Sequence, residues 1–190
     1  MSNILIIGAT GSLAQSVIAA AKQNPALNLT LFAREPKRIG ENLAQNCRII
    51  QGDALNVEDL NAAMQGQDIV YINLAGDLGA MADNIVQAMN ANGVKRVIAI
   101  SSIGIYDDPI KAVLRPYRAL ADIIEQSGLD YTILHPDWFT NGREIDYALT
   151  PKGQPERGGA VSRASIADFV VKLFAEPNQY IGENLNISKL

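Results

Sequence analysis

The chain has 190 residues, of which 48% are hydrophobic and 19% are charged, and its formal net charge is −4. That length fits one domain with a sizeable core, and the slight acidity gives no reason to expect nucleic acid or an anionic membrane as a partner. A single cysteine excludes an internal disulfide, and one cysteine with one histidine argues against a His/Cys metal cluster.

The sequence also carries no sign of a membrane or export signal. No apolar run reaches the length of a membrane span, and the first residues show neither a basic region nor the apolar core of a signal peptide. Cys47, as the lone cysteine, fits a reducing compartment. We therefore expect a cytoplasmic protein that does not bind membranes.

The first predicted element is a strand at residues 4–7, which runs directly into a glycine-containing turn and a helix at residues 12–23. Gly8 permits a tight turn, Gly11 lets a phosphate approach the backbone, and Ala14 lets the helix pack closely on the strand. The helix start offers free N–H groups to an anion. This layout, G-x-x-G-x-x-A, is a variant of the dinucleotide fingerprint and predicts a pyrophosphate site at Gly8, Thr10, Gly11, Ser12 and Leu13.

Strands and helices then alternate along the chain. Strands are expected at residues 29–33, 47–50, 68–73, 96–101, 131–134 and 184–187, and helices at 57–64, 80–92, 111–126 and 165–175. Strands that are apolar on both faces and joined by helices favour an α/β fold with a doubly wound parallel sheet, the Rossmann fold, in a single domain over residues 1–190.

Residues 137–159 break this alternation. The segment is polar and rich in glycine and proline, with a weak strand signal only near residues 147–149. We expect it to be an excursion over the carboxyl edge of the sheet, where a substrate lid would lie.

Six segments of the chain match one known pattern. They are the turn at residues 8–11, Gly52-Asp53, residues 73–76 (NLAG), Ser101-Ser102, residues 127–136 (SGLDYTILHP) and residues 161–168 (VSRASIAD). In these segments the chain resembles the atypical short-chain dehydrogenase/reductases, in the single-domain NAD(P)H-binding branch with biliverdin/flavin reductase-like and NmrA-like proteins. The resemblance implies that Asp53 contacts adenine and that Leu74, Ala75, Gly76 and Ser101 line the cofactor path. As an alternative, Asp53 and the glycines are turn residues.

The residues after the second strand bear on the choice of cofactor. No carboxylate ends this strand to take the ribose 2′-OH of NAD(H); Arg34 stands there instead, followed by Glu35, Lys37 and Arg38. A guanidinium can bind the 2′-phosphate of NADP(H) in bidentate fashion. The position of Arg34 therefore predicts NADP(H) in preference to NAD(H), the alternative being a set of solvated loop charges.

The catalytic Tyr-x-x-x-Lys pair of most short-chain dehydrogenases is missing. In one alignment Arg118 takes the Lys position and Leu114 the Tyr position; in the other, Tyr117 pairs with Ala121. Arg118 can bind ribose hydroxyls or phosphate but cannot replace the lysine. Ordinary alcohol–carbonyl chemistry is therefore not expected.

Three other side chains are candidates for the chemistry. Ser102 and Tyr106 could hydrogen-bond an acceptor carbonyl, or could be a strand-end hydroxyl that caps backbone groups and a half-buried loop aromatic. His135, where the family more often has arginine, could donate a proton, or could be packed at a structural corner. Trp138 and Phe139 could wall an aromatic acceptor pocket or anchor the excursion.

Two functions remain open on the sequence. The first is an NADPH-dependent oxidoreductase that reduces a conjugated small-molecule acceptor such as a flavin or quinone, since such an acceptor can take its proton from water. The second is a catalytically silent NADP(H)-binding redox sensor of the NmrA-like type. Arg163 is expected to be structural, no metal is expected, and the sequence assigns no oligomeric state.

Overall fold

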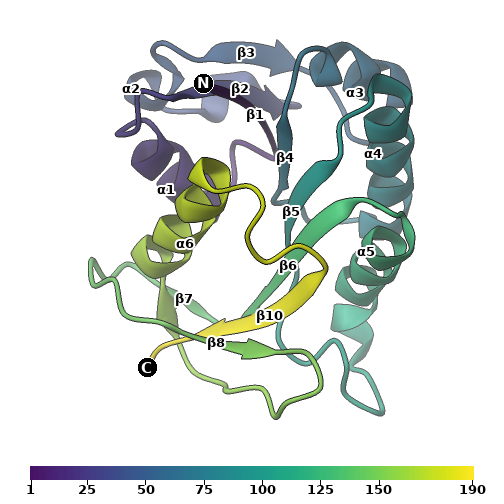
Figure 1. Cartoon of the computed structure of the whole chain (residues 1–190), viewed down its shortest axis with the longest axis vertical. Coiled ribbons are helices and arrows are strands. Elements are labelled where there is room, and N and C mark those ends of the chain that lie inside the picture. The colour runs from purple at the N-terminus through teal and green to yellow at the C-terminus, as the bar shows by residue number, and fades with distance from the viewer.

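A central sheet of eight strands runs through the molecule in the order β3-β2-β1-β4-β5-β6-β10-β8 (Figure 1). The computed structural model describes residues 1–190. All neighbouring strands pair in parallel except β8, which pairs antiparallel with β10. The strands are β1 (Ser2–Ile7), β2 (Leu27–Ala33), β3 (Arg48–Gln51), β4 (Ile69–Ile72), β5 (Arg96–Ile100), β6 (Asp130–Pro136), β8 (Ala148–Pro151) and β10 (Glu183–Ser188).

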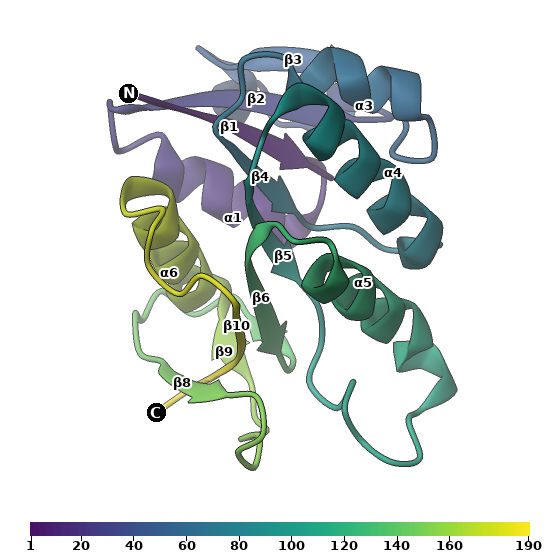
Figure 2. The same ribbon diagram turned by 45° about the vertical axis from the view of Figure 1, so that its right-hand side comes forward.

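Helices cover both faces of this sheet (Figure 2). One face carries α1 (Ser12–Ala21) and α6 (Arg163–Ala175), and the other carries α3 (Val57–Met64), α4 (Leu78–Asn92) and α5 (Arg115–Gln126). Three short turns of helix complete the set: η1 (Pro36–Arg38), α2 (Glu41–Ala44) and η2 (Ala112–Leu114). A separate parallel pair joins β7 (Phe139–Thr140) to β9 (Val161–Ser162).

The sheet is buried on both faces because consecutive residues of its central strands are apolar, so that each strand presents hydrophobic side chains to both sides. Along β1, Ile4 and Ile6 join the core beneath α1 and α6, whereas Leu5 and Ile7 join the core beneath α3, α4 and α5. This arrangement confirms the predicted single doubly wound α/β sheet. The chain moves outward from β1 to β2 and β3, then returns to β4 on the other side of β1, which creates the switch point of a Rossmann fold.

Helix ends follow the local sequence signals. The Asn56 side chain accepts hydrogen bonds from the backbone N–H groups of Glu58 and Asp59, as its predicted N-cap role requires, and Gly93 ends α4 at φ +70°. The helix expected over residues 111–126 differs: η2 comes first and α5 begins only at Arg115. Pro116 explains this start, because its fixed φ and missing N–H suit the first turn of a helix.

Residues 137–159 contain β7 and β8. The weak strand signal becomes β8, which extends the sheet beyond β10 at its lateral edge. The beginning of the segment follows β6 directly, and Phe139 of β7 pairs with Val161 of β9. The segment thus passes from the carboxyl end of β6 to the outer edge of the sheet.

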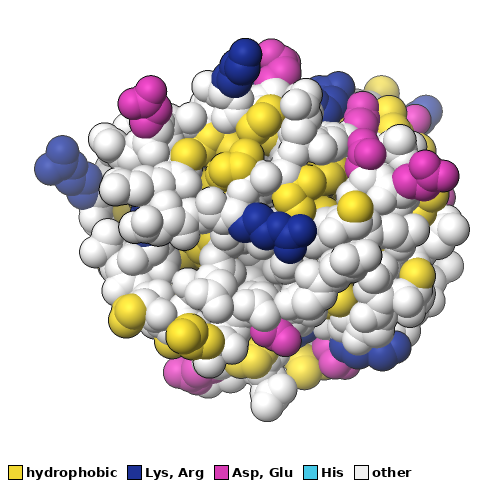
Figure 3. All heavy atoms as spheres, turned by 90° about the horizontal axis from the view of Figure 1, so that it is seen from above, with side chains coloured by type: hydrophobic (Ala, Val, Ile, Leu, Met, Phe, Trp, Pro, Cys, Tyr) yellow, Lys and Arg dark blue, Asp and Glu magenta, His cyan; other side chains and the backbone are white.

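Charged side chains are spread over the surface of the molecule. On the face shown in Figure 3, basic and acidic side chains are scattered among hydrophobic ones, and neither charge forms a continuous patch there. No helix combines the length and hydrophobicity of a membrane span.

The core predicts a specific cost of mutation at Phe174. This ring is fully buried on α6 and meets Tyr71 edge-to-face, with 6.0 Å between ring centroids. We expect Phe174→Ala to lower the free energy of unfolding by about 3–5 kcal/mol, because it leaves a cavity between helix and sheet. Urea denaturation measures this, with the exposed Leu55→Ala as control. Equal small losses in both variants would contradict the packing described.

Candidate functional site

A cleft of about 870 Å³ lies where the parallel strands end at their carboxyl side. The segments after β1, β2, β3, β4, β5 and β6 all contribute to its lining. Because β1 and β4 are neighbours at the switch point, the turn after β1 lies beside the segment after β4. The cleft is therefore placed where open parallel sheets bind ligands.

The turn after β1 depends on Gly8. Its φ is +86°, and a Cβ there would lie only 2.1 Å from the Asn73 carbonyl oxygen. Gly11 caps α1, and its backbone N–H donates to the Gly8 carbonyl at 3.0 Å. A Cβ on Gly11 would lie 3.3 Å from that same carbonyl oxygen. The two glycines thus bring bare backbone to the cleft, as predicted.

Unpaired donors gather at this turn. Gly11 offers no side-chain acceptor to α1, and the backbone N–H groups of Ser12 and Leu13 make no hydrogen bond within the chain. The buried Asn73 Nδ2, beside Gly11, also has no partner. Such donors favour an anionic group. The residues present therefore fit the pyrophosphate of a dinucleotide.

One end of the cleft is lined by Arg34, Glu35 and Arg38. Glu35 pairs with Arg38 across 3.7 Å, with both side chains exposed. Arg34 forms no ion pair, so its guanidinium remains available to a phosphate.

Asp53 makes a turn contact and also lines the cleft. Its Oδ1 accepts a hydrogen bond from the Leu55 N–H at 3.0 Å, a turn contact, and its residue also lines the cleft. The preceding Gly52 is required by packing, since a Cβ there would come within 2.5 Å of the Phe32 ring. Asp53 is therefore both a turn residue and part of the cleft wall.

The segments after β4 and β5 line the middle of the cleft with Leu74, Ala75, Ser101 and Ser102. The Ser101 hydroxyl donates to the Tyr117 carbonyl at 3.1 Å, and that of Ser102 to the Ile103 carbonyl at 3.3 Å. Both hydroxyls thus bond backbone groups. Gly76, in contrast, does not line the cleft; it turns the chain into α4 at φ +111°.

The other end of the cleft is apolar and aromatic. It is lined by Val113, Leu114, Tyr117, Pro136, Trp138 and Phe139, with Lys111 at its side. We refer to Tyr117, Trp138 and Phe139 as the aromatic wall. Trp138 is 80% exposed and Val113 is 72% exposed. Large hydrophobic side chains left open to solvent within a cleft indicate a binding surface for an apolar, planar group.

Two side chains of this end, Lys111 and Tyr117, are not among the predicted site residues. The sequence suggests Tyr117 only as half of a Tyr/Lys pair, and no motif in the sequence marks Lys111 as a residue of the site. Arg163, expected to be structural, also lines the cleft: its Nε donates to the Ser12 Oγ at 3.2 Å, and its Nη1 to the Asn141 side chain at 2.8 Å. Its Nη1 also donates to the Thr140 backbone carbonyl at 3.3 Å, which agrees with the structural role expected for it.

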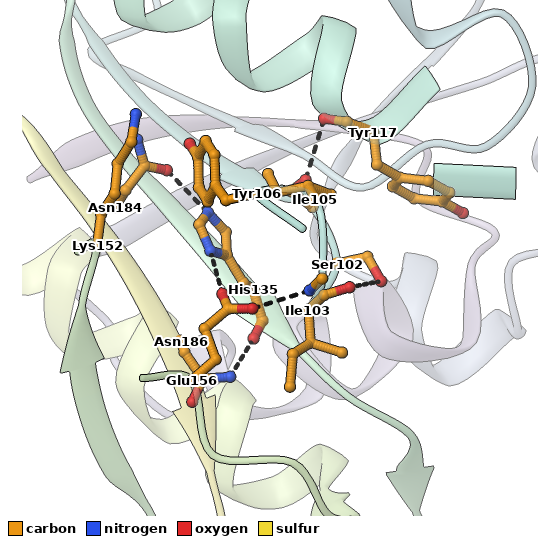
Figure 4. A network of polar contacts seen from close by, with 12 residues as sticks. Ser102, Ile103, Ile105, Tyr106, Tyr117, His135, Lys152, Glu156, Asn184 and Asn186 are labelled. Carbon is orange, nitrogen blue, oxygen red and sulfur yellow. Dashed lines mark hydrogen bonds and ion pairs between the residues drawn. The ribbon is translucent and has the colours of Figure 1, made fainter. Parts of the chain in front are cut away.

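The structure does not bring Tyr106, Arg118 and His135 into the cleft. Arg118 pairs with Asp122 at 2.6 Å and lies over the Tyr106 ring. Burial, aided by a hydrogen bond to Glu125, raises the pKa of Tyr106. His135 is 1% exposed and packs beside Tyr106 (Figure 4). The three form a cluster of their own because β6 directs His135 toward the α5 side of the sheet.

No group of three or more His, Cys, Asp or Glu side chains lies close enough to hold a metal ion.

Comparison with known proteins agrees with this geometry. A family model described as NAD(P)H-binding matches residues 8–177. The structure of a Rossmann-fold NAD(P)-binding family protein from Shigella flexneri is 46% identical and superposes with a TM-score of 0.89, covering all of this chain and 94% of that one. A short-chain dehydrogenase/reductase from Veillonella parvula in complex with NADP is 24% identical, with a TM-score of 0.90 over 99% of this chain and 94% of that one; at this identity the likeness shows the fold.

Among curated proteins, quinone oxidoreductase 2 of Escherichia coli (strain K12) is 26% identical over 178 residues, which is 87% of this chain. The match covers 60% of that protein, so this chain spans less than two thirds of the length of its relative.

The turn after β1 yields a direct test of cofactor binding. Gly11→Ala places a methyl group on the turn after β1. We expect it to weaken NADPH binding by roughly tenfold or more, because a phosphate can no longer approach the backbone there. Nicotinamide fluorescence measures the affinity. Gly40→Ala is the control, since a Cβ at Gly40 meets nothing within 4 Å. Unchanged affinity in Gly11→Ala would contradict the placement of the pyrophosphate.

Proposed function

The chain belongs to the NAD(P)H-binding family of atypical short-chain dehydrogenase/reductases, and from that premise we propose that it is an NADPH-dependent reductase of a conjugated, planar small molecule such as a quinone or flavin. The observation that carries the proposal is the solvent-exposed aromatic wall at one end of the cleft, with Trp138 80% exposed. Bound NADPH would supply a hydride to the acceptor.

The cleft favours positioning over acid–base catalysis. The two alignments of the catalytic pair place it at Leu114 and Arg118 or at Tyr117 and Ala121. Leu114 and Tyr117 line the cleft, but Arg118 pairs with Asp122 outside the cleft and Ala121 is buried. The Tyr-x-x-x-Lys pair that protonates an alkoxide in most short-chain dehydrogenases is therefore missing. A conjugated acceptor does not need one, because its reduced form is stabilised by delocalisation and can be protonated by water.

In this proposal, different residues of the cleft bind the pyrophosphate, the nicotinamide half of the cofactor and the acceptor. The turn from Gly8 to Leu13 holds the pyrophosphate, and the strand-end residues Leu74, Ala75 and Ser101 line the path of the nicotinamide half. The aromatic wall stacks on the acceptor and excludes water from one of its faces. Tyr117 lines the same end of the cleft, and we assign to its phenol the hydrogen bond to an acceptor oxygen.

Arg34 supports NADPH as the preferred form of the cofactor. It lies at the end of β2, where the adenosine ribose of a Rossmann cofactor lies, and Glu35 is engaged by Arg38 rather than by Arg34. The Escherichia coli relative, named a quinone oxidoreductase, supports a quinone as the first acceptor to try.

The reductase is tested by NADPH oxidation with a panel of quinones and free flavins. We expect acceptor-dependent turnover, and we expect Trp138→Ala to raise the acceptor KM roughly 3- to 10-fold because a stacking face is lost. Ile181→Ala, which removes an exposed side chain outside the cleft, is the control. Tight NADPH and NADP⁺ binding with no turnover on any acceptor would refute the reductase and leave the redox sensor.

The cofactor preference rests on Arg34. We expect Arg34→Ala to weaken NADPH binding roughly 10- to 100-fold and NADH binding less than about twofold, because only NADPH loses a charge-assisted contact. Lys37→Ala removes a nearby positive charge that does not line the cleft, and it serves as the control. Equal losses of NADPH and NADH affinity would show that Arg34 does not read the 2′-phosphate.

A further inference from the structure

A partly buried polar cluster lies on the α5 side of β6 and β10, and Figure 4 shows most of its residues, none of which lines the cleft. It consists of His135, Glu156, Asn184, Glu125 and Lys152. His135 Nδ1 lies 3.0 Å from Glu156 Oε1, and its Nε2 lies 2.8 Å from Asn184 Oδ1. Asn184 Nδ2 in turn bonds Glu125, which also accepts from Lys152 at 2.8 Å. Both nitrogens of a fully buried imidazole are thus occupied.

The hydrogen-bond partners of His135 determine how many protons its imidazole ring carries. The Asn184 amide must turn its NH₂ group toward the Glu125 carboxylate, so only its oxygen can face His135. Nε2 therefore has to donate. Nδ1 faces a carboxylate oxygen, so it has to donate as well. A histidine that donates from both nitrogens is an imidazolium cation.

The charges of the cluster agree with this state. Burial raises the pKa of Glu156, but hydrogen bonds from His135 and Gly104 outweigh burial and keep it below its usual value. For Glu125, burial is likewise outweighed by bonds from Lys152, Tyr106 and Asn184. Two carboxylates then face two cations, Lys152 and His135. Arg118, over the Tyr106 ring, is balanced by Asp122. A neutral His135 would leave the partly buried carboxylate of Glu156 without a cationic partner.

Glu156 connects this cluster to the cleft. Its Oε2 accepts the Gly104 N–H at 2.8 Å, while the preceding residue, Ile103, donates its N–H to the Pro136 carbonyl at 3.0 Å. Ser102 and Ile103 line the cleft between the cofactor path and the aromatic wall. One carboxylate therefore holds the segment after β5 from behind, and His135 holds that carboxylate.

We propose that His135, as a buried imidazolium, and Glu156 are positioning residues that fix the Ser102–Gly104 segment at the acceptor end of the cleft. Neither residue touches the acceptor or the cofactor. The effect on turnover rests on the proposed reductase function, whereas the protonation state and the contact with Gly104 do not.

The protonation state is read by NMR. His135 is the only histidine of the chain, so its ring ¹⁵N signals in tag-free protein need no assignment by mutation. We expect both ring nitrogens to carry a proton, as the two hydrogen bonds require. Glu156→Gln is the matched comparison, because its amide NH₂ can donate to Nδ1, and there we expect one unprotonated nitrogen. A neutral ring in the unaltered protein would overturn the imidazolium.

The positioning role is read from Glu156→Ala. We expect kcat to fall roughly 10- to 100-fold, because small displacements of a positioned group are costly, with NADPH affinity changed less than about twofold. The Gly104 amide should exchange its hydrogen faster than in the unaltered protein. Glu156→Gln keeps an acceptor for Gly104 and should recover most of the activity. Glu183→Gln removes an exposed carboxylate of β10 and is the control.

Unchanged kcat together with unchanged Gly104 exchange in folded Glu156→Ala would overturn the proposal. If the unaltered protein reduces no acceptor, the proposed function fails by itself. Hydrogen exchange and the ring ¹⁵N signals then still decide whether His135 and Glu156 hold the segment.

Discussion

The approach of Gly8 to the Asn73 carbonyl is the constraint on which the site depends. A side chain at Gly8 would collide with that oxygen, so the turn after β1 can lie against the end of β4 only because residue 8 has no Cβ. This close approach aligns the free N–H groups of α1 with the ends of the parallel strands. In the proposed function, the backbone supplies the anion site and side chains at either end supply the selectivity.

At the end of β6, successive side chains enter different surroundings on the two faces of the sheet. Leu134 packs into the core beneath α1 and α6, while His135, the next residue, enters the polar cluster beneath α5. Beyond Pro136 the chain turns into the cleft and exposes Trp138. The ends of the strands therefore line the cleft, whereas the polar cluster lies outside it and contacts the segment after β5.

Local signals explain how much could be predicted from the sequence. The strands, the turn after β1 and the Asn56 cap depend on neighbouring residues, so pattern reasoning found them, and the family resemblance supplied Asp53 and Ser101. The destination of His135, Tyr106 and Arg118 depends on which face of β6 meets α5 and on contacts with Glu156 and Glu125. Those contacts join residues about twenty positions apart or more through a segment with no regular pattern, and no local signal encodes them. Lys111 and Tyr117 also line the cleft, and Lys111 lies before the start of α5 at Arg115 rather than within the helix expected from residue 111.

The most direct test of this account is a crystal structure of the protein with NADP⁺. The account predicts the pyrophosphate on the turn from Gly8 to Leu13, the 2′-phosphate at Arg34, and the nicotinamide beside Ser101 and Ser102, facing the aromatic wall. A cofactor bound in the reverse direction, or with its nicotinamide away from Trp138, would contradict it, because no acceptor stacked on that wall could then receive the hydride.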